Sequence, residues 1–433
     1  MLDQISSLKK LIPTDSFMKK ILICLCSVLL LAACSNEIPS EDPLPRKGRT
    51  ILAYLVSNNQ AGGDLDSYLK KNVLWMYESM SSLKDSCSLL LYYRPKAGDP
   101  YVTAPSILEF VSDGHGNINS MPALQGAELT EANVFQSAIV RKSYTDPEHN
   151  AVDPVIMAQV FKDMQKAVPS ETYGLIFGSH ATGWMEANQT VGRAFGDDNA
   201  YSINVPELAA VLQKGFGKGI LDFVLFDACM MGTAEVAYEL RNTADYLILS
   251  PAEVMSAGFP YFKITKYLLS ADNSEQNAIN VAKDFIDYYK NEYSYSWGTI
   301  AVIKTNEISA LANITCSIMK QYQDNLVKFD NRKIDYFQAH YGYGRSPLDH
   351  SAYDFRAFMR ELTDNNIPSD FEEQLERVVI YKNYVDDYKL VNIDSDIYSG
   401  IGCYIPDTRY LKWNTYFRTL QWYSATGWDE TGW

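Results

Sequence analysis

The chain has 433 residues, of which 47% are hydrophobic and 21% are charged. This length and apolar content allow a large buried core and exclude a mainly disordered chain. The formal net charge is −15. Such an excess of acidic side chains argues against nucleic acid as a partner, because its phosphates would be repelled.

Residues 1–33 have the features of a signal segment, which we expect to start at Met18. Lys19 and Lys20 follow, and an apolar run then extends from Ile21 to Ala33. This run is shorter than the ~20 residues that a membrane-spanning helix requires. A basic start, a short apolar stretch and small residues at its end are typical of a secretory signal.

The signal segment ends in Leu31-Ala32-Ala33-Cys34, which resembles a bacterial lipobox. The resemblance implies lipidation of Cys34 and a lipid anchor in the bacterial cell envelope, either periplasmic or surface-exposed. The alternative is an ordinary signal peptide with a chance cysteine. Residues 34–48 are rich in Ser, Pro and acidic side chains, which predicts a flexible tether.

Beyond the tether, apolar runs that predict strands alternate with amphipathic segments that predict helices. Predicted strands cover residues 51–57, 88–93, 107–112, 116–121, 173–177, 223–226, 246–249, 299–303 and 399–405. Predicted helices cover residues 65–80, 154–168, 205–216, 234–241 and 410–422. Short strands that are apolar throughout, separated by helices, are typical of a parallel sheet covered on both faces.

These elements predict an α/β protein with two regions. We expect residues 49–305 to form a three-layer sandwich with a mostly parallel central sheet. Residues 306–433 are expected to form a helical C-terminal subdomain packed on this core. Asp153 and Thr233 are predicted to cap the helices that begin after them.

Four cysteines lie beyond the predicted tether, at positions 87, 229, 316 and 403. Their wide spacing predicts neither a disulfide framework nor a zinc site. Cys87 and Cys316 lie in strand-like and helical runs, and we interpret them as small core residues. Cys229 differs from them because it directly follows a predicted buried strand.

Two successive predicted strands end in residues that can carry chemistry. His180 follows the strand at 173–177, and Cys229 follows the strand at 223–226. Ligands of open α/β sheets bind at the carboxyl ends of the strands. If these strands are neighbours, ~4.8 Å apart, both side chains overhang the same edge.

A cysteine and a histidine in this position predict nucleophilic catalysis. The thiolate of Cys229 would be the nucleophile, and His180 would take its proton and return it to the leaving amine. The backbone N–H groups of Ala181 and Cys229 are candidate donors for an oxyanion. The alternative is that both side chains are unconnected structural residues.

Two segments resemble the clostripain family of cysteine peptidases, which are relatives of caspases, gingipains and legumains. Phe226–Gly232 (FDACMMG) resembles the family's nucleophile segment, and Ser179–Trp184 (SHATGW) resembles its histidine segment. Residues 398–406 and 425–429 look like the family's C-terminal region. The resemblance implies a caspase-like fold and hydrolysis of peptide bonds in proteins or peptides, typically after Arg or Lys.

The resemblance also implies a pocket for the side chain before the cut. Asp227 occupies the position of a family carboxylate that contributes to this pocket, and its alternative role is to orient the turn. Glu253 is the acidic residue in the loop after the next strand and is a second candidate for substrate binding.

Two departures from the family pattern bear on specificity and activity. Ala181 replaces the glycine that commonly follows the histidine, and residues 254–259 contain no carboxylate. A more neutral pocket would accept a different side chain. The alternative functions are a non-catalytic peptide- or glycan-binding surface lipoprotein with the same fold, and a transpeptidase or amidase that uses the same pair.

The segment from Met185 to Asn204 is interpreted as a surface loop, with a lid or a processing site at Arg193 as the alternative. Asp197 and Asp198 lie in this segment, but calcium requires six to eight oxygen ligands. We therefore expect no required cofactor, although some members of the family depend on calcium.

Overall fold

The computed structural model describes residues 46–433, except 60–62, 188–194, 218, 327, 332–333, 335, 338–349, 388, 390 and 392. The signal segment, Cys34, most of the predicted tether and Arg193 lie outside the described residues. Pro45–Trp433 forms one compact unit. Within the described part of the chain, no helix combines the length and apolar character needed to cross a bilayer.

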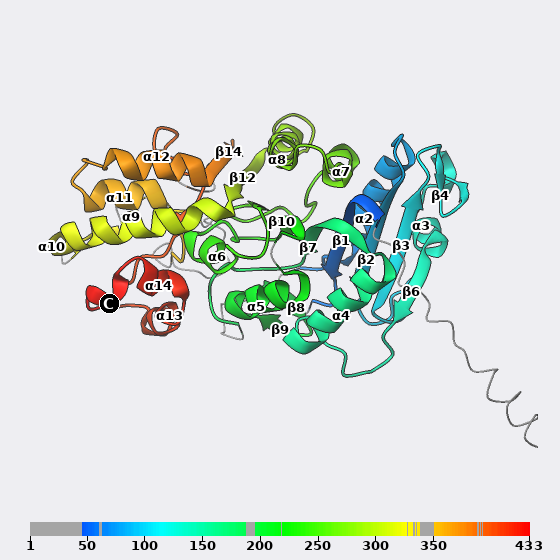
Figure 1. The fold of residues 1–433 in the computed structure, drawn as a ribbon, viewed down its shortest axis with the longest axis horizontal. Helices are drawn as coiled ribbons and strands as arrows, with labels where there is room; N and C mark the ends of the chain where they lie inside the picture. The colour runs from blue at the N-terminus through cyan, green and yellow to red at the C-terminus, as the bar shows by residue number, and fades with distance from the viewer. Residues whose placement is uncertain are drawn as a thin grey trace, which may run out of the picture. The chain divides into compact units, whose positions relative to one another are not determined.

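A mixed sheet of 11 strands forms the centre of this unit, in the order β14-β12-β11-β10-β7-β1-β2-β3-β4-β5, with β6 paired to β3. Figure 1 shows this succession from β14 to β4. The strands are β1 (Arg46–Val56), β2 (Cys87–Arg94), β3 (Ser106–Ser112), β4 (Asn117–Ile118), β5 (Met121–Pro122), β6 (Ile139–Ser143), β7 (Ser170–Gly178), β10 (Leu221–Asp227), β11 (Tyr246–Leu249), β12 (Trp297–Lys304) and β14 (Val379–Asp386).

The strands in the middle of the sheet, from β11 to β2, are parallel to one another, whereas both flanks are antiparallel. The prediction of a mostly parallel central sheet is therefore confirmed. β1 begins at Arg46, so it includes the end of the segment that the sequence assigns to the tether.

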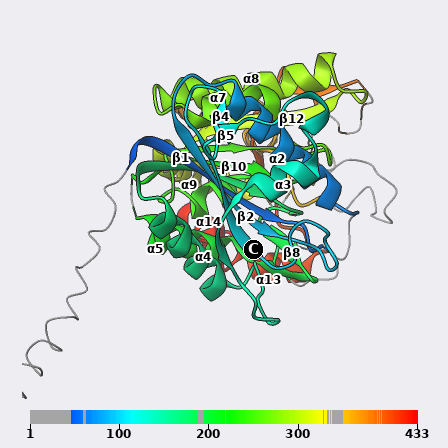
Figure 2. The same cartoon turned by 90° about the vertical axis from the view of Figure 1, so that its right-hand side faces the viewer.

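Helices cover both faces of the sheet (Figure 2). One face carries α2 (Asp66–Ser81), α3 (Glu131–Ser137), α7 (Tyr261–Leu269) and α8 (Ser274–Asn291). The other face carries α4 (Pro154–Ala167), α5 (Val205–Phe216), α6 (Ala234–Glu239) and α9 (Ile308–Gln321).

Alternate residues of β1 point into two separate cores. Leu52 and Tyr54 pack with one helical layer, and Ile51 and Ala53 pack with the other. Both sets are buried, which is why this strand is apolar throughout and does not alternate. The three-layer sandwich is confirmed by this arrangement.

The region after residue 306 adds helices and also an edge strand of the main sheet. Its helices are α9, α10 (Gln323–Leu326), α11 (Phe355–Leu362), α12 (Ser369–Val378), α13 (Leu411–Phe417) and α14 (Gln421–Ala425). β14 pairs with β12, so this region shares the central sheet. The helix predicted at 410–422 is divided into α13 and α14.

Shorter strands complete the fold. The strand predicted at 399–405 is reduced to β15 (Gly402–Cys403), which pairs with β13 (Tyr353–Asp354). β8 (Phe195–Asp198) pairs with β9 (Tyr201–Ile203). The interpretation of residues 185–204 as a surface loop is wrong for β8, because Asp197 and Asp198 are each only 1% exposed.

Phe177 lies at the centre of an aromatic cluster beneath the carboxyl end of β7. Its ring centroid is 4.7 Å from that of Phe195 and 5.5 Å from that of Phe226. We expect Phe177→Ala to reduce the free energy of unfolding by about 3–5 kcal/mol in urea titrations, because it leaves a cavity. Tyr201→Ala, at an exposed site, is the control. Equal losses in both variants would contradict this account of the core.

Candidate active site

β7 and β10 are neighbouring parallel strands, and Asp227 pairs with Gly178 at their carboxyl ends. Only Ser179 separates Gly178 from His180, and only Ala228 separates Asp227 from Cys229. The expectation that these strands are adjacent is confirmed. The histidine and the cysteine therefore leave the sheet at the same edge.

The histidine segment is held from two sides. Ser179 Oγ donates to the carbonyl oxygen of Val56 on β1 at 3.3 Å and accepts from the N–H of Asp197 at 3.1 Å. The carbonyl oxygen of His180 accepts from the N–H of Gly196 at 2.9 Å. β1 and β8 thus fix the backbone on both sides of the imidazole.

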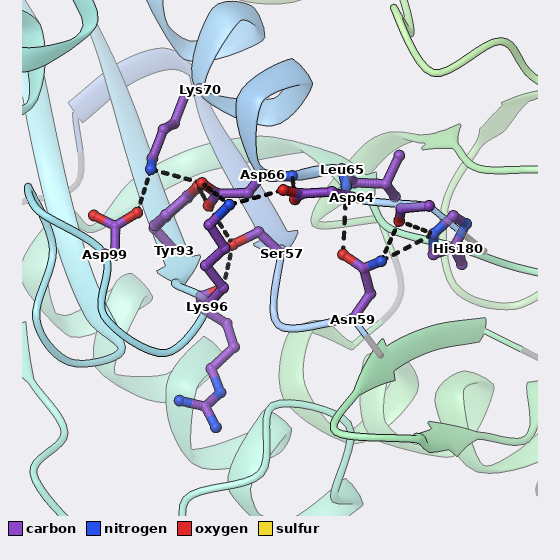
Figure 3. A network of polar contacts seen from close by, with 12 residues as sticks. Ser57, Asn59, Asp64, Leu65, Asp66, Lys70, Tyr93, Lys96, Asp99 and His180 are labelled. Atoms are coloured by element: carbon purple, nitrogen blue, oxygen red, sulfur yellow. Dashed lines mark hydrogen bonds and ion pairs between the residues drawn. The ribbon is translucent and has the colours of Figure 1, made fainter. Parts of the chain in front are cut away.

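The His180 ring faces the segment that follows β1 (Figure 3). Its Nε2 lies 3.2 Å from the carbonyl oxygen of Gly63 and 3.4 Å from Asn59 Nδ2. The sequence analysis named no partner for the histidine. These two groups were missed because they belong to neither motif.

The turn that carries Cys229 is fixed by its neighbours on both sides. Met230 has a φ of 61°, and its N–H donates to the carbonyl oxygen of Ala252 at 2.9 Å. Gly232 donates to Ser250 O and accepts from the N–H of Gly402, each at 2.8 Å. The loop after β11 and strand β15 therefore support the turn together.

The sulfur of Cys229 contacts the loop between β11 and α7. The N–H of Val254 points at Sγ from 3.3 Å, and Sγ lies 3.6 Å from the carbonyl oxygen of Val254. A backbone N–H directed at the sulfur stabilises negative charge on it. Cys229 is half-buried and forms no disulfide. Cys87 and Cys316 are also half-buried, and Cys87 packs against one of the two hydrophobic cores.

The histidine and cysteine segments touch each other at Gly183. This residue has a φ of 75°, and a Cβ on it would overlap the carbonyl oxygen of Met230. Only glycine allows both the left-handed conformation and this close approach. The geometry of one segment is thereby coupled to that of the other.

Asp227 lies at the carboxyl end of β10 and is nearly fully buried among polar groups. Its Oδ2 accepts from Tyr261 Oη at 3.0 Å, from the N–H of Phe259 at 3.3 Å and from Asn72 Nδ2 at 3.4 Å. Burial raises the pKa of Asp227 to about 6, although the bonds from Tyr261 and Phe259 counteract this effect. A Cβ on Gly258 would overlap the same oxygen.

Asn72 is a neighbour of Asp227 that no motif in the sequence indicated. It comes from α2, and its Oδ1 is buried without a hydrogen-bond partner. An unpaired buried acceptor costs free energy unless a ligand supplies a donor. Asn72 Oδ1 and Asp227 are therefore both suited to a donor-rich side chain.

The remaining candidate residues have different surroundings. Glu253 is half-buried and directly precedes Val254, so it lies on the loop that contacts the sulfur. Asp198 pairs with Arg94 at 2.9 Å and accepts from Asn58 Nδ2 at 2.6 Å. Its carboxylate is thus engaged by protein donors. Within the residues that the structure describes, no group of metal-ligating side chains is assembled.

A helix-covered parallel sheet, with a half-exposed thiol and an imidazole at the exits of adjacent strands, defines the class of cysteine peptidases with a caspase-like fold. The comparisons with known proteins agree with this class. The chain belongs to the clostripain family, because the family model Peptidase_C11 matches residues 53–433.

Clostripain from Hathewaya histolytica is 29% identical over 230 residues, which is 50% of this chain but 41% of that protein. The match thus spans less than half the length of that curated relative.

Among solved structures, an inactive zymogen C11 protease from Parabacteroides distasonis is 26% identical, with a TM-score of 0.67 over 88% of this chain and 99% of its own. A secreted C11 cysteine protease from Bacteroides thetaiotaomicron, in complex with an irreversible peptide inhibitor, is 24% identical. Its TM-score is 0.65 over 89% of this chain and 100% of its own, a likeness of fold.

The contact at Gly183 leads to a test of the coupling between the two segments. We expect Gly183→Ala to lower kcat by about 100-fold in the folded protein, because the histidine segment must move away from Met230. Gly217→Ala is a matched control, since Gly217 has a φ of 68° but no neighbouring atom within 4 Å. Peptide hydrolysis assays should separate the two variants, and equal activities would contradict the coupling.

Proposed function

We propose that this protein is a cysteine endopeptidase that hydrolyses peptide bonds with Cys229 as nucleophile and His180 as general base and acid. The observation that carries the proposal is the register of β7 and β10, which pairs Gly178 with Asp227, each two residues before His180 and Cys229 respectively. Membership of the clostripain family supports it.

The reaction would proceed through an acyl-enzyme. His180 takes the proton of the Cys229 thiol, and the thiolate attacks the peptide carbonyl carbon. The protonated imidazole then gives this proton to the leaving amine as the C–N bond breaks. In the second step His180 takes a proton from water, and the resulting hydroxide releases the new carboxyl product and restores the thiol.

The contacts of the two segments support these roles. The Gly63 carbonyl lies at Nε2 of His180, so the ring would exchange the proton with the thiol through Nδ1. The N–H of Val254 would stabilise the thiolate after His180 has taken its proton and before the sulfur attacks the carbonyl carbon. The N–H groups of Ala181 and Cys229 would receive the negative oxygen of each tetrahedral intermediate.

Asp227 would receive the side chain that precedes the cut, with a preference for Arg or Lys. A carboxylate pairs strongly with a guanidinium or an ammonium group. The unpaired Oδ1 of Asn72 beside it adds a neutral acceptor. Glu253 would contribute to substrate binding from the loop whose next residue, Val254, contacts the Cys229 sulfur.

The location and cofactor requirement form part of the same proposal. A signal segment that ends at Cys34 would place the enzyme in the bacterial cell envelope with a lipid anchor, where it meets protein and peptide substrates. The related Bacteroides thetaiotaomicron protease is described as secreted, which supports export. The thiol–imidazole reaction needs no metal or organic cofactor.

The role of the thiol predicts a simple result with a fluorogenic peptide library. Cys229→Ala should lower turnover by at least ~1,000-fold without loss of folding, because no other group can form the acyl-enzyme. Cys316→Ala, which alters a half-buried thiol on α9, should retain full activity. Substantial turnover in Cys229→Ala would refute the proposed nucleophile.

The raised pKa of Asp227 predicts how specificity varies with pH. Below about pH 6 this carboxyl is protonated and loses the charge that attracts a basic side chain. The ratio of kcat/KM for peptides with Lys against Leu before the cut should therefore fall as the pH decreases through about 6. Titration of Cys229 and His180 affects both peptides equally and cancels in this ratio.

Asp227→Asn serves as the control for the pH experiment. This variant should lower the Lys-to-Leu ratio and make it independent of pH. A ratio that keeps its full pH dependence in Asp227→Asn would remove Asp227 from the pocket.

A further inference from the structure

A network of polar contacts between β1 and α2 ends at His180 (Figure 3). Asn59 Nδ2 lies 3.4 Å from His180 Nε2, and the carbonyl oxygen of Gly63 lies 3.2 Å from the same nitrogen. The Asn59 amide also donates to the Gly63 carbonyl. Two groups, the Asn59 amide and the Gly63 carbonyl, therefore meet at Nε2 of the imidazole ring.

The orientation of the Asn59 amide follows from its other contact. The backbone N–H of Leu65 lies 3.4 Å from Asn59 Oδ1, and a backbone N–H is only a donor. The amide oxygen consequently faces Leu65, and the amide nitrogen faces Gly63 and His180. A carbonyl oxygen has two lone pairs, so Gly63 can accept from Asn59 and from His180 at once.

This arrangement selects one tautomer of the neutral histidine. When Nε2–H donates to Gly63, the lone pair of the ring is on Nδ1. Asn59 and the ring nitrogen are then both donors to the same carbonyl, so their 3.4 Å contact reflects a shared acceptor. Asn59 thereby holds the Gly63 carbonyl in place, and this carbonyl in turn holds the His180 ring.

A buried ionic cluster anchors the segment that carries these groups. Asp66 and Lys70 of α2 are 2% and 4% exposed. Asp66 Oδ2 pairs with Lys70 Nζ at 2.7 Å, while its Oδ1 accepts from Tyr93 Oη at 2.7 Å and from Ser57 Oγ at 3.0 Å. Lys70 also pairs with Asp99.

The bond between Ser57 and Asp66 joins the two ends of the segment. Burial alone would raise the pKa of Asp66, but hydrogen bonds from Lys70, Tyr93 and Ser57 outweigh it and lower the pKa. The charge on Asp66 is thus retained. Buried ion pairs add little net stability, because desolvation offsets their attraction. The ion pair and hydrogen bonds of Asp66 instead fix the position of Ser57 relative to the start of α2.

We propose that Asn59 is a positioning residue of the active site, which holds the Gly63 carbonyl against His180 Nε2 and so fixes the orientation of the imidazole that serves Cys229. The buried cluster of Asp66, Lys70 and Asp99 anchors the segment on which Asn59 lies. This inference rests on the proposed peptidase function of Cys229 and His180.

The test compares Asn59→Ala with the wild type in peptide hydrolysis and in alkylation of Cys229 by iodoacetamide. We expect kcat to fall ~10- to 100-fold with KM changed less than ~3-fold, because the ring is misplaced but the substrate pocket is intact. Alkylation should slow as well, since the imidazole supports the thiolate. Asn291→Ala, at the exposed end of α8, is a matched control whose amide donates to Asp287 at 2.7 Å.

Asn59→Asp provides a second measurement that does not depend on the alanine variant. It keeps an acceptor for Leu65 but loses the donor to Gly63 and adds a negative charge beside His180. This charge favours the imidazolium, so the acidic limb of the kcat/KM profile, which reports protonation of the base, should move to higher pH. If Asn59→Ala does not fold, an unmoved acidic limb in Asn59→Asp overturns the inference.

The outcomes separate this inference from the function beneath it. Unchanged kcat and alkylation in a folded Asn59→Ala variant would overturn the positioning role and leave the peptidase proposal intact. A wild-type protein whose Cys229 is inert to alkylation and to substrate would overturn both.

Discussion

Backbone hydrogen bonds between β7 and β10 fix the spacing on which the proposed chemistry depends. Parallel strands lie ~4.8 Å apart, and their register places Gly178 opposite Asp227. A shift of this register by one residue would move His180 along the edge relative to Cys229 and reverse the faces of the strand that shifts. The two buried cores resist such a shift, because both faces of these strands are packed.

The loops above the sheet convert this spacing into a defined site. The cysteine turn is held by Ala252 on one side and by Gly402 on the other, and it meets the histidine segment at Gly183. The C-terminal region therefore contributes to the site: Gly402 supports the turn that carries Cys229, and β14 adds an edge strand to the sheet. The central strands, the cysteine turn and the C-terminal region are therefore connected by direct contacts around the site.

Much of the sheet could be predicted because central strands must be apolar on both faces. The apolar run at 246–249 coincides with β11 for this reason. The helix predicted at 205–216 coincides with α5 because its amphipathic pattern buries one face. β14 could not be found in this way. It lies at the edge of the sheet and carries half-exposed polar residues, so it has no continuous apolar run. The antiparallel direction of β12 depends on the path of the chain, which no local pattern records.

The site was predictable only where strand ends and family motifs coincide, as at His180 and Cys229. Tertiary packing brings three further residues to the site, namely Val254, Gly258 and Asn72. Their local sequence contains no pattern that predicts this position. Asn59 is an intermediate case. It follows the carboxyl end of β1, so the rule that located His180 and Cys229 would also have pointed to it.

The central claim is that Cys229 and His180 act as a pair. The most direct measurement is mass spectrometry after reaction with an irreversible, thiol-directed peptide inhibitor that carries Lys at the position before the cut. The account predicts a single adduct on the peptide that contains Cys229, formed much more slowly in His180→Ala. An adduct on Cys87 or Cys316 instead, or an equal rate in the histidine variant, would contradict it.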